Sequence, residues 1–236
     1  MTRFDALFSA MSAADLAAVT LLFAAWLAVG FVIENPPAAR PSVSFLMRAY
    51  RHEWMRQFIT RQPRIFDSAI LASLREGTTF FASATMIAIG GGLALLGNLD
   101  RLRGVAAGFE AAGTPVILWQ AKIVVTLIFV ANAFLKFVWA HRLFGYCAIM
   151  MASVPNEPEH PAAIPRAAQA AQINVTAARS FNAGLRSVYF AIAALGWLAG
   201  PLMLLATTAL VTWVSWRREF TSHSRTVMLQ DPPAAP

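Results

Sequence analysis

Residues 16–33, with the sequence LAAVTLLFAAWLAVGFVI, form an apolar run that contains no charged side chain. A helix of this length nearly spans the hydrocarbon core of a bilayer, which is about 30 Å thick. Similar runs follow at residues 78–97, 116–140 and 188–216. Because backbone polar groups find no water in lipid, each run is expected to be helical. The sequence therefore predicts an all-α integral membrane protein with four transmembrane helices.

The overall composition points to the same class. Hydrophobic residues make up 58% of the chain and charged residues 13%, whereas soluble domains devote about 25% of their residues to charge. A globule of this size cannot bury so much apolar surface. The 19 lysine and arginine residues exceed the 12 acidic residues. In a membrane protein this excess is typical of cytoplasmic loops, so no nucleic-acid partner is predicted.

The chain is expected to form a single membrane domain over residues 1–216, followed by a polar, disordered tail over residues 217–236. Beyond Pro165 the sequence is rich in helix formers. Residues 166–216 are therefore expected to form one long helix with a kink at Gly200-Pro201, which extends beyond the bilayer on the cytoplasmic side.

Arginine is concentrated in the first and third connections between the predicted spans. By the positive-inside rule, these connections lie in the cytoplasm and both termini lie on the non-cytoplasmic side. Lysine is rare, with Lys122 and Lys136 alone beside abundant arginine and alanine. This usage is typical of a GC-rich bacterium, which predicts the bacterial inner membrane as the location.

The segment YRHEWMRQF, residues 50–58, contains a His52-Glu53 pair like that of a zinc-binding helix. The second histidine of the H-E-x-x-H motif is replaced by Arg56, which would repel a metal ion, so no metal site is predicted. Apolar residues recur at helical spacing over about residues 43–60. We expect an amphipathic helix that lies at the membrane interface or packs against the other helices, with Glu53 paired to an arginine.

The clearest polar pattern precedes and enters the last apolar run. Arg179, Asn182, Arg186 and Tyr189 follow one another at intervals of three, four and three residues. This spacing places the four side chains on one face of a helix. Cations at a membrane helix need carboxylates, lipid phosphates or water as partners, so the face predicts a belt of polar interactions on the cytoplasmic side.

The candidate carboxylates for this belt are Glu53, Asp67 and Glu76. The candidate belt residues are Arg142, Arg179, Asn182, Arg186, Tyr189, Lys136, Glu53, Glu76 and His52. Three interpretations stay open. The belt forms ion pairs that fix helix register, it binds phosphate, anionic lipid or a conducted anion, or it takes part in catalysis.

Other parts of the sequence give no site. Cys147 is the only cysteine, so neither an intrachain disulfide nor a thiolate metal cage can form. No carboxylate lies centrally in a predicted span, which disfavours a proton relay. No nucleophile–base pair is evident, and His141 beside Arg142 is a poor haem ligand, so no cofactor is predicted. The glycines at 90–92, 196 and 200 are interpreted as helix-packing positions.

Four stretches taken in order carry a resemblance: RHEWM, ASATMIAIGG, KFVWAHRLFGYCAIMMASVP and RSFNAGLRSVYFAIAALGWLAGP. They resemble a family of bacterial and plant membrane proteins known as domain of unknown function 599, over about residues 45–216. The resemblance implies a few membrane spans and these signature segments. It implies no reaction.

Three functions follow from these features, in order of preference. The first is a non-enzymatic inner-membrane module that forms a homo-oligomer or serves a larger complex, with a belt that binds internal carboxylates or anionic membrane lipids. The first alternative is an oligomeric anion channel or small transporter with Arg142 and Arg186 at its inner mouth. The second alternative is a membrane enzyme that acts on lipid headgroups, with Glu53 or His52 as its base. The apolar midplane and the missing catalytic pair set this order.

Overall fold

The computed structural model describes residues 3–98 and 115–230, and this part of the chain contains helices and no strand. The predicted all-α fold is therefore confirmed for the described residues. The helices are α1 (Arg3–Ala10), α2 (Ala13–Glu34), α3 (Val43–Phe58), α4 (Ile65–Gly97), α6 (Val116–Ala152), α7 (Ala163–Leu195), α8 (Pro201–Phe220) and α9 (His223–Met228), with a short 3-10 helix, η1 (Gly196–Ala199), between α7 and α8.

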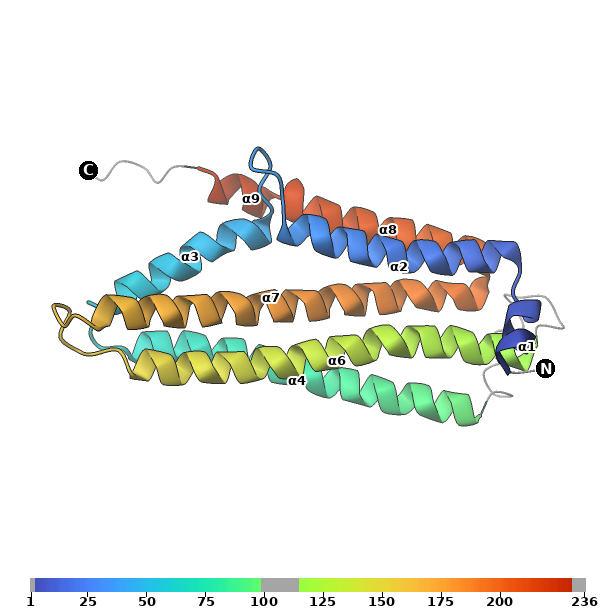
Figure 1. Ribbon diagram of the computed structural model, residues 1–236, viewed down its shortest axis with the longest axis horizontal. Helices are drawn as coiled ribbons and strands as arrows, with labels where there is room; N and C mark the ends of the chain where they lie inside the picture. Colours follow the sequence, from blue (N-terminus) through green and yellow to red (C-terminus); the bar gives the residue numbers. More distant parts are fainter. Residues whose placement is uncertain (1–2, 99–114, 231–236) are drawn as a thin grey trace.

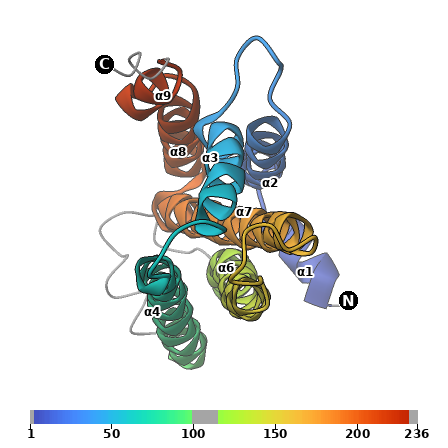
Figure 2. The same cartoon turned by 90° about the vertical axis from the view of Figure 1, so that its left-hand side faces the viewer.

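Helix α7 is the centre of an elongated bundle (Figures 1 and 2). It packs against α6 on one side, and α6 in turn packs against α4. On the other side of α7, the parallel pair α2 and α8 covers one end of the bundle, and α3 crosses the other end obliquely. Helices α4, α6 and α7 therefore extend well past the layer formed by α2 and α8.

Within residues 3–98 and 115–230, three helices are long and apolar enough to cross a membrane, namely α2, α4 and α6. They contain the predicted spans 16–33, 78–97 and 116–140. Helix α2 has 22 residues, or about 33 Å of rise, which matches the thickness of the hydrocarbon core. Helices α4 and α6, with 33 and 37 residues, are longer than a bilayer needs.

The prediction of one continuous helix over residues 166–216 is wrong. Helix α7 ends at Leu195, and the chain reverses so that α8 runs back beside α7 and α2. Gly200 has φ +101°, a backbone conformation that residues with a Cβ rarely adopt, and Pro201 fits the first turn of α8 because its missing N–H needs no partner there. Thr207 Oγ1 donates to the carbonyl of Ala193 at 2.8 Å and ties the two helices together.

The C-terminal segment is more ordered than the sequence predicts. Helix α8 continues to Phe220, and α9 covers His223–Met228. Arg225 Nε donates to the carbonyl of Pro41 at 2.8 Å, which ties α9 to the connection between α2 and α3. Helical structure thus extends into the segment predicted to be a disordered tail, and residues 231–236 lie outside the described chain.

The glycines predicted to pack helices have different roles. A Cβ on Gly92 would lie 2.5 Å from a methyl carbon of Leu127, so α4 and α6 approach closely there. Gly90 and Gly91 have no neighbouring atom within 4 Å of a Cβ position, and the packing interpretation does not apply to them within this chain. Gly200 serves the turn rather than a helix contact.

Two hydrophobic cores lie one behind the other along the bundle. The first joins α2, α6, α7, η1 and α8 and contains Leu22, Phe129, Phe190 and Trp197. The second joins α3, the start of α4, the end of α6 and the start of α7, which together we call the cap. In the cap the small side chains of Ala163, Ala167, Ala170 and Ala171 let α7 approach its neighbours closely. The cap therefore has its own core beyond the layer of α2 and α8.

Helix α3 forms where an amphipathic helix was predicted, and it packs across α7. Met55 and Phe58 are buried in the cap core, whereas Tyr50 is half exposed. Arg51 Nη1 donates to Oδ1 of Asn174 on α7. Burial of this guanidinium lowers the pKa of Arg51, because removing a charge from water disfavours the charged form.

Candidate functional site

Glu34, the last residue of α2, binds three arginines. Its Oε2 lies 3.0 Å from Arg48 Nη2 and 2.9 Å from Arg179 Nε, and its Oε1 lies 3.0 Å from Arg186 Nη2. Both Glu34 and Arg186 are about nine-tenths buried. A single carboxylate thus joins α2, α3 and α7, and it neutralises only one of three guanidinium groups.

Local sequence explains how these groups meet. Asn35, Pro36 and Pro37 end α2 directly after Glu34. Ser42 then begins α3: its Oγ accepts from the N–H of Phe45 at 3.1 Å and donates to the carbonyl of Ile33 at 2.8 Å. This corner turns α3 so that Arg48 reaches back to Glu34.

A second carboxylate, Glu219 on α8, lies next to this cluster. Its two oxygens accept from the N–H and Oγ of Ser44, at 2.9 and 2.8 Å. Asn182 Nδ2 on α7 donates to the same Ser44 Oγ at 3.3 Å. These hydrogen bonds hold the start of α3 between α7 and α8. Both oxygens of the Glu219 carboxylate accept from Ser44.

A cavity of about 110 Å³ lies between α2, α7 and α8 beside Glu34. Its lining residues are Ile33, Asn182, Leu185, Arg186, Tyr189, Ser215, Arg218 and Glu219. Arg218 Nη1 donates to the hydroxyl of Tyr189 at 2.6 Å and lies over its ring. Ser215 Oγ is buried and has no hydrogen-bond partner among the described residues. We call this cavity and the Glu34 cluster the Glu34 site.

The charges of the Glu34 site do not cancel. Four arginines (Arg48, Arg179, Arg186 and Arg218) face two carboxylates (Glu34 and Glu219), so the formal charge is 4 − 2 = +2. Arginine binds phosphate and carboxylate groups through paired N–H donors. The buried, unpartnered hydroxyl of Ser215 offers a further donor. The site thus combines an excess of positive charge with a small cavity.

The structure brings together only part of the candidate belt. Four belt residues on α7 belong to the Glu34 site, namely Arg179, Asn182, Arg186 and Tyr189. The carboxylate partner of Arg179 and Arg186 is Glu34, not Glu53, Asp67 or Glu76. Sequence reasoning missed Glu34, although it ends the first apolar run and is the only carboxylate between Asp15 and Glu53.

The remaining belt residues lie elsewhere. Arg142 is exposed on α6 and hydrogen-bonds the hydroxyl of Tyr146. Lys136 is exposed, and its carbonyl accepts from Ser180 Oγ at 2.9 Å. His52 and Glu76 are exposed and have no side-chain partner among the residues that the structure describes.

Glu53 pairs with an arginine, as its predicted role requires, but that arginine lies on its own helix. Arg56 Nη2 lies 2.7 Å from Glu53 Oε2, and Gln57 Nε2 donates to Glu53 Oε1 at 2.7 Å. The hydrogen bond from Arg56 lowers the pKa of Glu53. A carboxylate with a lowered pKa is a weaker base, which disfavours Glu53 as the base of a headgroup-modifying enzyme.

Asp67, near the start of α4, forms a separate cluster in the cap. Its side chain is fully buried, accepts from Trp54 Nε1 at 2.6 Å and pairs with Arg61. No group of three or more histidine, cysteine, aspartate or glutamate side chains within the described residues is placed to hold a metal ion. The Asp67 cluster therefore joins α3 to α4 as a structural contact.

Aromatic residues indicate the depth of the Glu34 site. Trp213 and Trp216 are exposed on α8, where Arg217 lies over the Trp213 ring and Arg40 over the Trp216 ring. Tryptophan and arginine in such an arrangement are typical of the boundary between the hydrocarbon core and water. Arg40 belongs to the connection that follows α2, whose last residue is Glu34.

The fold and this site define an all-helical protein of membrane type with a charged cluster at one end of its apolar spans. The chain belongs to the family described as protein of unknown function DUF599, whose model matches residues 17–224. No curated protein and no solved structure matches the chain. The family likeness agrees with the resemblance noted in the sequence and assigns no activity.

Proposed function

We propose that the protein is a non-enzymatic module of the bacterial inner membrane that holds the anionic headgroup of a lipid in the Glu34 site. The observation that carries the proposal is the formal charge of +2 around a cavity of about 110 Å³ lined by Arg186 and Arg218. A phosphate group at the membrane surface would supply the missing negative charge and accept from Ser215.

The depth of the site supports this ligand. Arg218 and Tyr189 line the cavity at the end of the apolar spans, where lipid phosphates lie. Lipid at this boundary is always at high local concentration, so a site with modest affinity would be occupied. A neutralised site would in turn hold α2, α7 and α8 together.

The arrangement also suggests a topology in which the cap is cytoplasmic. With α2 as a span, α1 and α9 fall on opposite sides of the membrane, because α9 contacts Pro41 beyond the end of α2. The proposal therefore places α1 on the non-cytoplasmic side and α9 on the cytoplasmic side, whereas the sequence predicts both termini on the non-cytoplasmic side. The end of α7 and α8 cross as a hairpin, and the arginine-rich cap satisfies the positive-inside rule.

Helix α4 supports the view that the module self-associates or serves a larger complex. Only 6% of its most apolar window is buried within the chain, and Phe80 and Ile87 are mostly exposed. An apolar groove of about 500 Å³ separates its membrane part from α6 and α7. Acyl chains or another transmembrane helix would cover this surface.

The lipid proposal predicts that Arg218→Gln removes a bound anionic lipid. Native mass spectrometry of protein released gently from its own membrane should show the native chain with one retained anionic lipid. We expect Arg218→Gln to lower this retention by about tenfold, since a charged hydrogen bond to phosphate is lost.

Arg217→Gln is the matched control, because Arg217 has the same charge on the same helix but lies outside the cavity. It should retain the lipid. Equal retention in the native protein and both variants, or equal retention of zwitterionic lipid, would contradict the proposal.

A second candidate function, anion permeation, is favoured by a row of hydroxyls on α8. Thr208, Thr212 and Ser215 have buried hydroxyl oxygens with no hydrogen-bond partner among the described residues. Hydroxyls in membrane helices usually bond a carbonyl one turn earlier, as Thr207 does. The row runs from the cavity about 10 Å into the membrane part of α8, which suits a hydrated path for an anion.

Cysteine labelling tests this path, because Cys147 is the only native cysteine. In a Cys147→Ala background, Thr212→Cys and Ser215→Cys should react about tenfold faster with an anionic methanethiosulfonate than with a cationic one, since the arginines attract the anion. Leu210→Cys, which lies on the exposed face of α8, is the control and should not show this preference. Equal rates with both reagents at residues 212 and 215 would exclude the path.

A further inference from the structure

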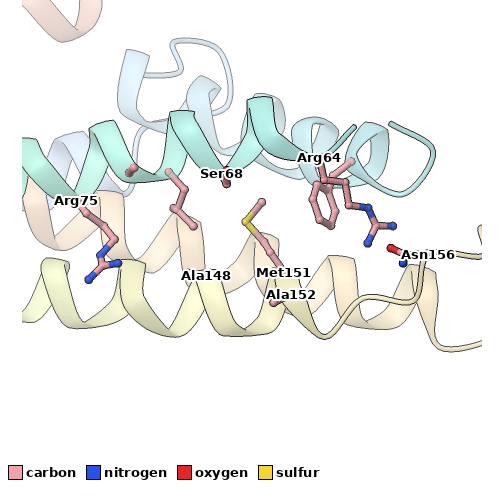
Figure 3. A pocket seen from close by; sticks show the side chains of 10 residues that line it. Arg64, Ser68, Arg75, Ala148, Met151, Ala152 and Asn156 are labelled. Atoms are coloured by element: carbon pink, nitrogen blue, oxygen red, sulfur yellow. The ribbon is translucent and has the colours of Figure 1, made fainter. Parts of the chain in front are cut away.

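The cap contains a second cavity that the Glu34 site does not use. Its volume is about 430 Å³, within the range of about 300–1,000 Å³ that small-molecule sites occupy. It lies between the start of α4 and the end of α6, beyond the spans (Figures 1 and 3). Its lining residues are Phe58, Arg64, Ser68, Leu71, Ala72, Arg75, Ala148, Met151, Ala152 and Asn156.

The cavity has a cation at each end and an apolar middle. Figure 3 shows Arg64 and Arg75 at opposite ends of the α4 wall, with Met151 on the facing α6 wall. The Cα atoms of the two arginines are about 16 Å apart along the helix, since three turns separate them. No carboxylate lines the cavity.

Arg64 is held in a fixed position, but one of its nitrogens has no partner among the described residues. Its Nη atoms donate to the carbonyls of Val154 at 2.9 Å, Pro155 at 2.8 Å and Ile59 at 3.2 Å. Its guanidinium lies over the Phe58 ring, 4.5 Å from the centroid. Its Nε is buried and has no partner among the described residues. A buried N–H of a charged group that lacks an acceptor is costly, and a ligand oxygen would satisfy it.

Arg75 completes the site at the membrane end. Its side chain is exposed, extends toward α6 in Figure 3, and forms no ion pair within the described residues. Leu71 and Met151 provide the apolar surface between the two arginines. The cavity therefore matches an elongated molecule with an apolar middle and an oxygen-bearing anionic group at each end.

We propose that this cavity binds an elongated organic dianion, whose two acidic groups pair with Arg64 and Arg75 while its apolar body lies on Leu71 and Met151. The site is separate from the Glu34 site and does not depend on lipid binding there. Carboxylate and phosphate groups share the chemistry required at each end.

Decanedioate is a suitable probe, with decane-1,10-diol as its uncharged counterpart. The full chain would be placed in nanodiscs of zwitterionic lipid, and binding measured by equilibrium dialysis against empty nanodiscs. We expect the dianion to bind and the diol to bind at least about tenfold more weakly, because it cannot form charged hydrogen bonds. Equal binding of the two probes would overturn the proposal.

Three variants locate the binding. Arg75→Gln should weaken decanedioate binding by about tenfold, and Ala148→Phe or Ala72→Leu should abolish it by filling the cavity. Circular dichroism checks that each variant keeps its helices, and the two filling variants act from different helices, so a folding defect in one leaves the other as a test. Unchanged binding in Arg75→Gln and in a folded filling variant would refute the site.

Two further comparisons separate this site from the lipid proposal. Arg218→Gln should bind decanedioate normally even if it loses its lipid. Nanodiscs with anionic lipid show the source of the ligand: competition with decanedioate would identify a lipid headgroup as the occupant, and no competition would identify an organic acid from the aqueous phase.

Discussion

Replacing Glu34 by glutamine is expected to lower the free energy of unfolding by about 3–5 kcal/mol, the range measured when one partner of a buried ion pair is removed. The substitution keeps the shape of the side chain but leaves Arg48, Arg179 and Arg186 without their shared carboxylate. Arg186 is nine-tenths buried, so water does not replace the lost interaction. Reversible unfolding in mixed micelles, followed by circular dichroism, measures the change.

Arg179→Gln is the matched control for this prediction, because Arg179 binds the same carboxylate but is more than half exposed. Its loss should cost less than about 1 kcal/mol, as for other exposed ion pairs. The double variant Glu34→Gln with Arg186→Met should be more stable than Glu34→Gln alone, since it removes a buried charge that has no partner. A loss below about 1 kcal/mol in Glu34→Gln would show that water or lipid already screens the cluster.

Replacing Asp67 by asparagine is expected to lower the free energy of unfolding by about 3 kcal/mol, through the cap rather than through the spans. Asp67 is fully buried and is the charge partner of Arg61 as well as the acceptor for Trp54 Nε1. An uncharged amide leaves Arg61 without its ion pair. The change can be followed by the tryptophan fluorescence of Trp54, because this residue donates a hydrogen bond to Asp67.

Glu53→Gln is the control for Asp67→Asn, because both carboxylates were candidate partners of the belt. Glu53 is exposed to water with Arg56 and Gln57, so no measurable loss of stability is expected. If Glu53→Gln destabilised the protein as strongly as Asp67→Asn, the surface of α3 would have to be buried against a membrane or a partner.

Short-range patterns predicted much of the fold correctly. Spans at 16–33, 78–97 and 116–140 lie within α2, α4 and α6, because long apolar runs have one stable backbone conformation in lipid. The shared face of Arg179, Asn182, Arg186 and Tyr189 follows from helical periodicity alone. Such features depend on neighbours a few residues away, and a single sequence contains them.

The reversal at Gly200 was harder to predict. A Gly-Pro pair within an apolar run is compatible with a kink or with a turn, and local propensity does not distinguish them. The turn is favoured by contacts that exist only after α8 folds back, such as the bond from Thr207 to Ala193 and the packing of α8 against α2. Whether residues 166–216 form one helix or two therefore depended on tertiary packing.

By itself the sequence determined that this chain is helical, that it is of membrane type, and which face of α7 carries its cations. Only the tertiary structure decided that Glu34 is the carboxylate those cations meet, since 152 residues separate it from Arg186. It also decided that the cap has a core and a cavity of its own. Periodicity assigns a residue to a face, but an ion pair also requires a partner at the same height on another helix, and that height is set by how the helices pack.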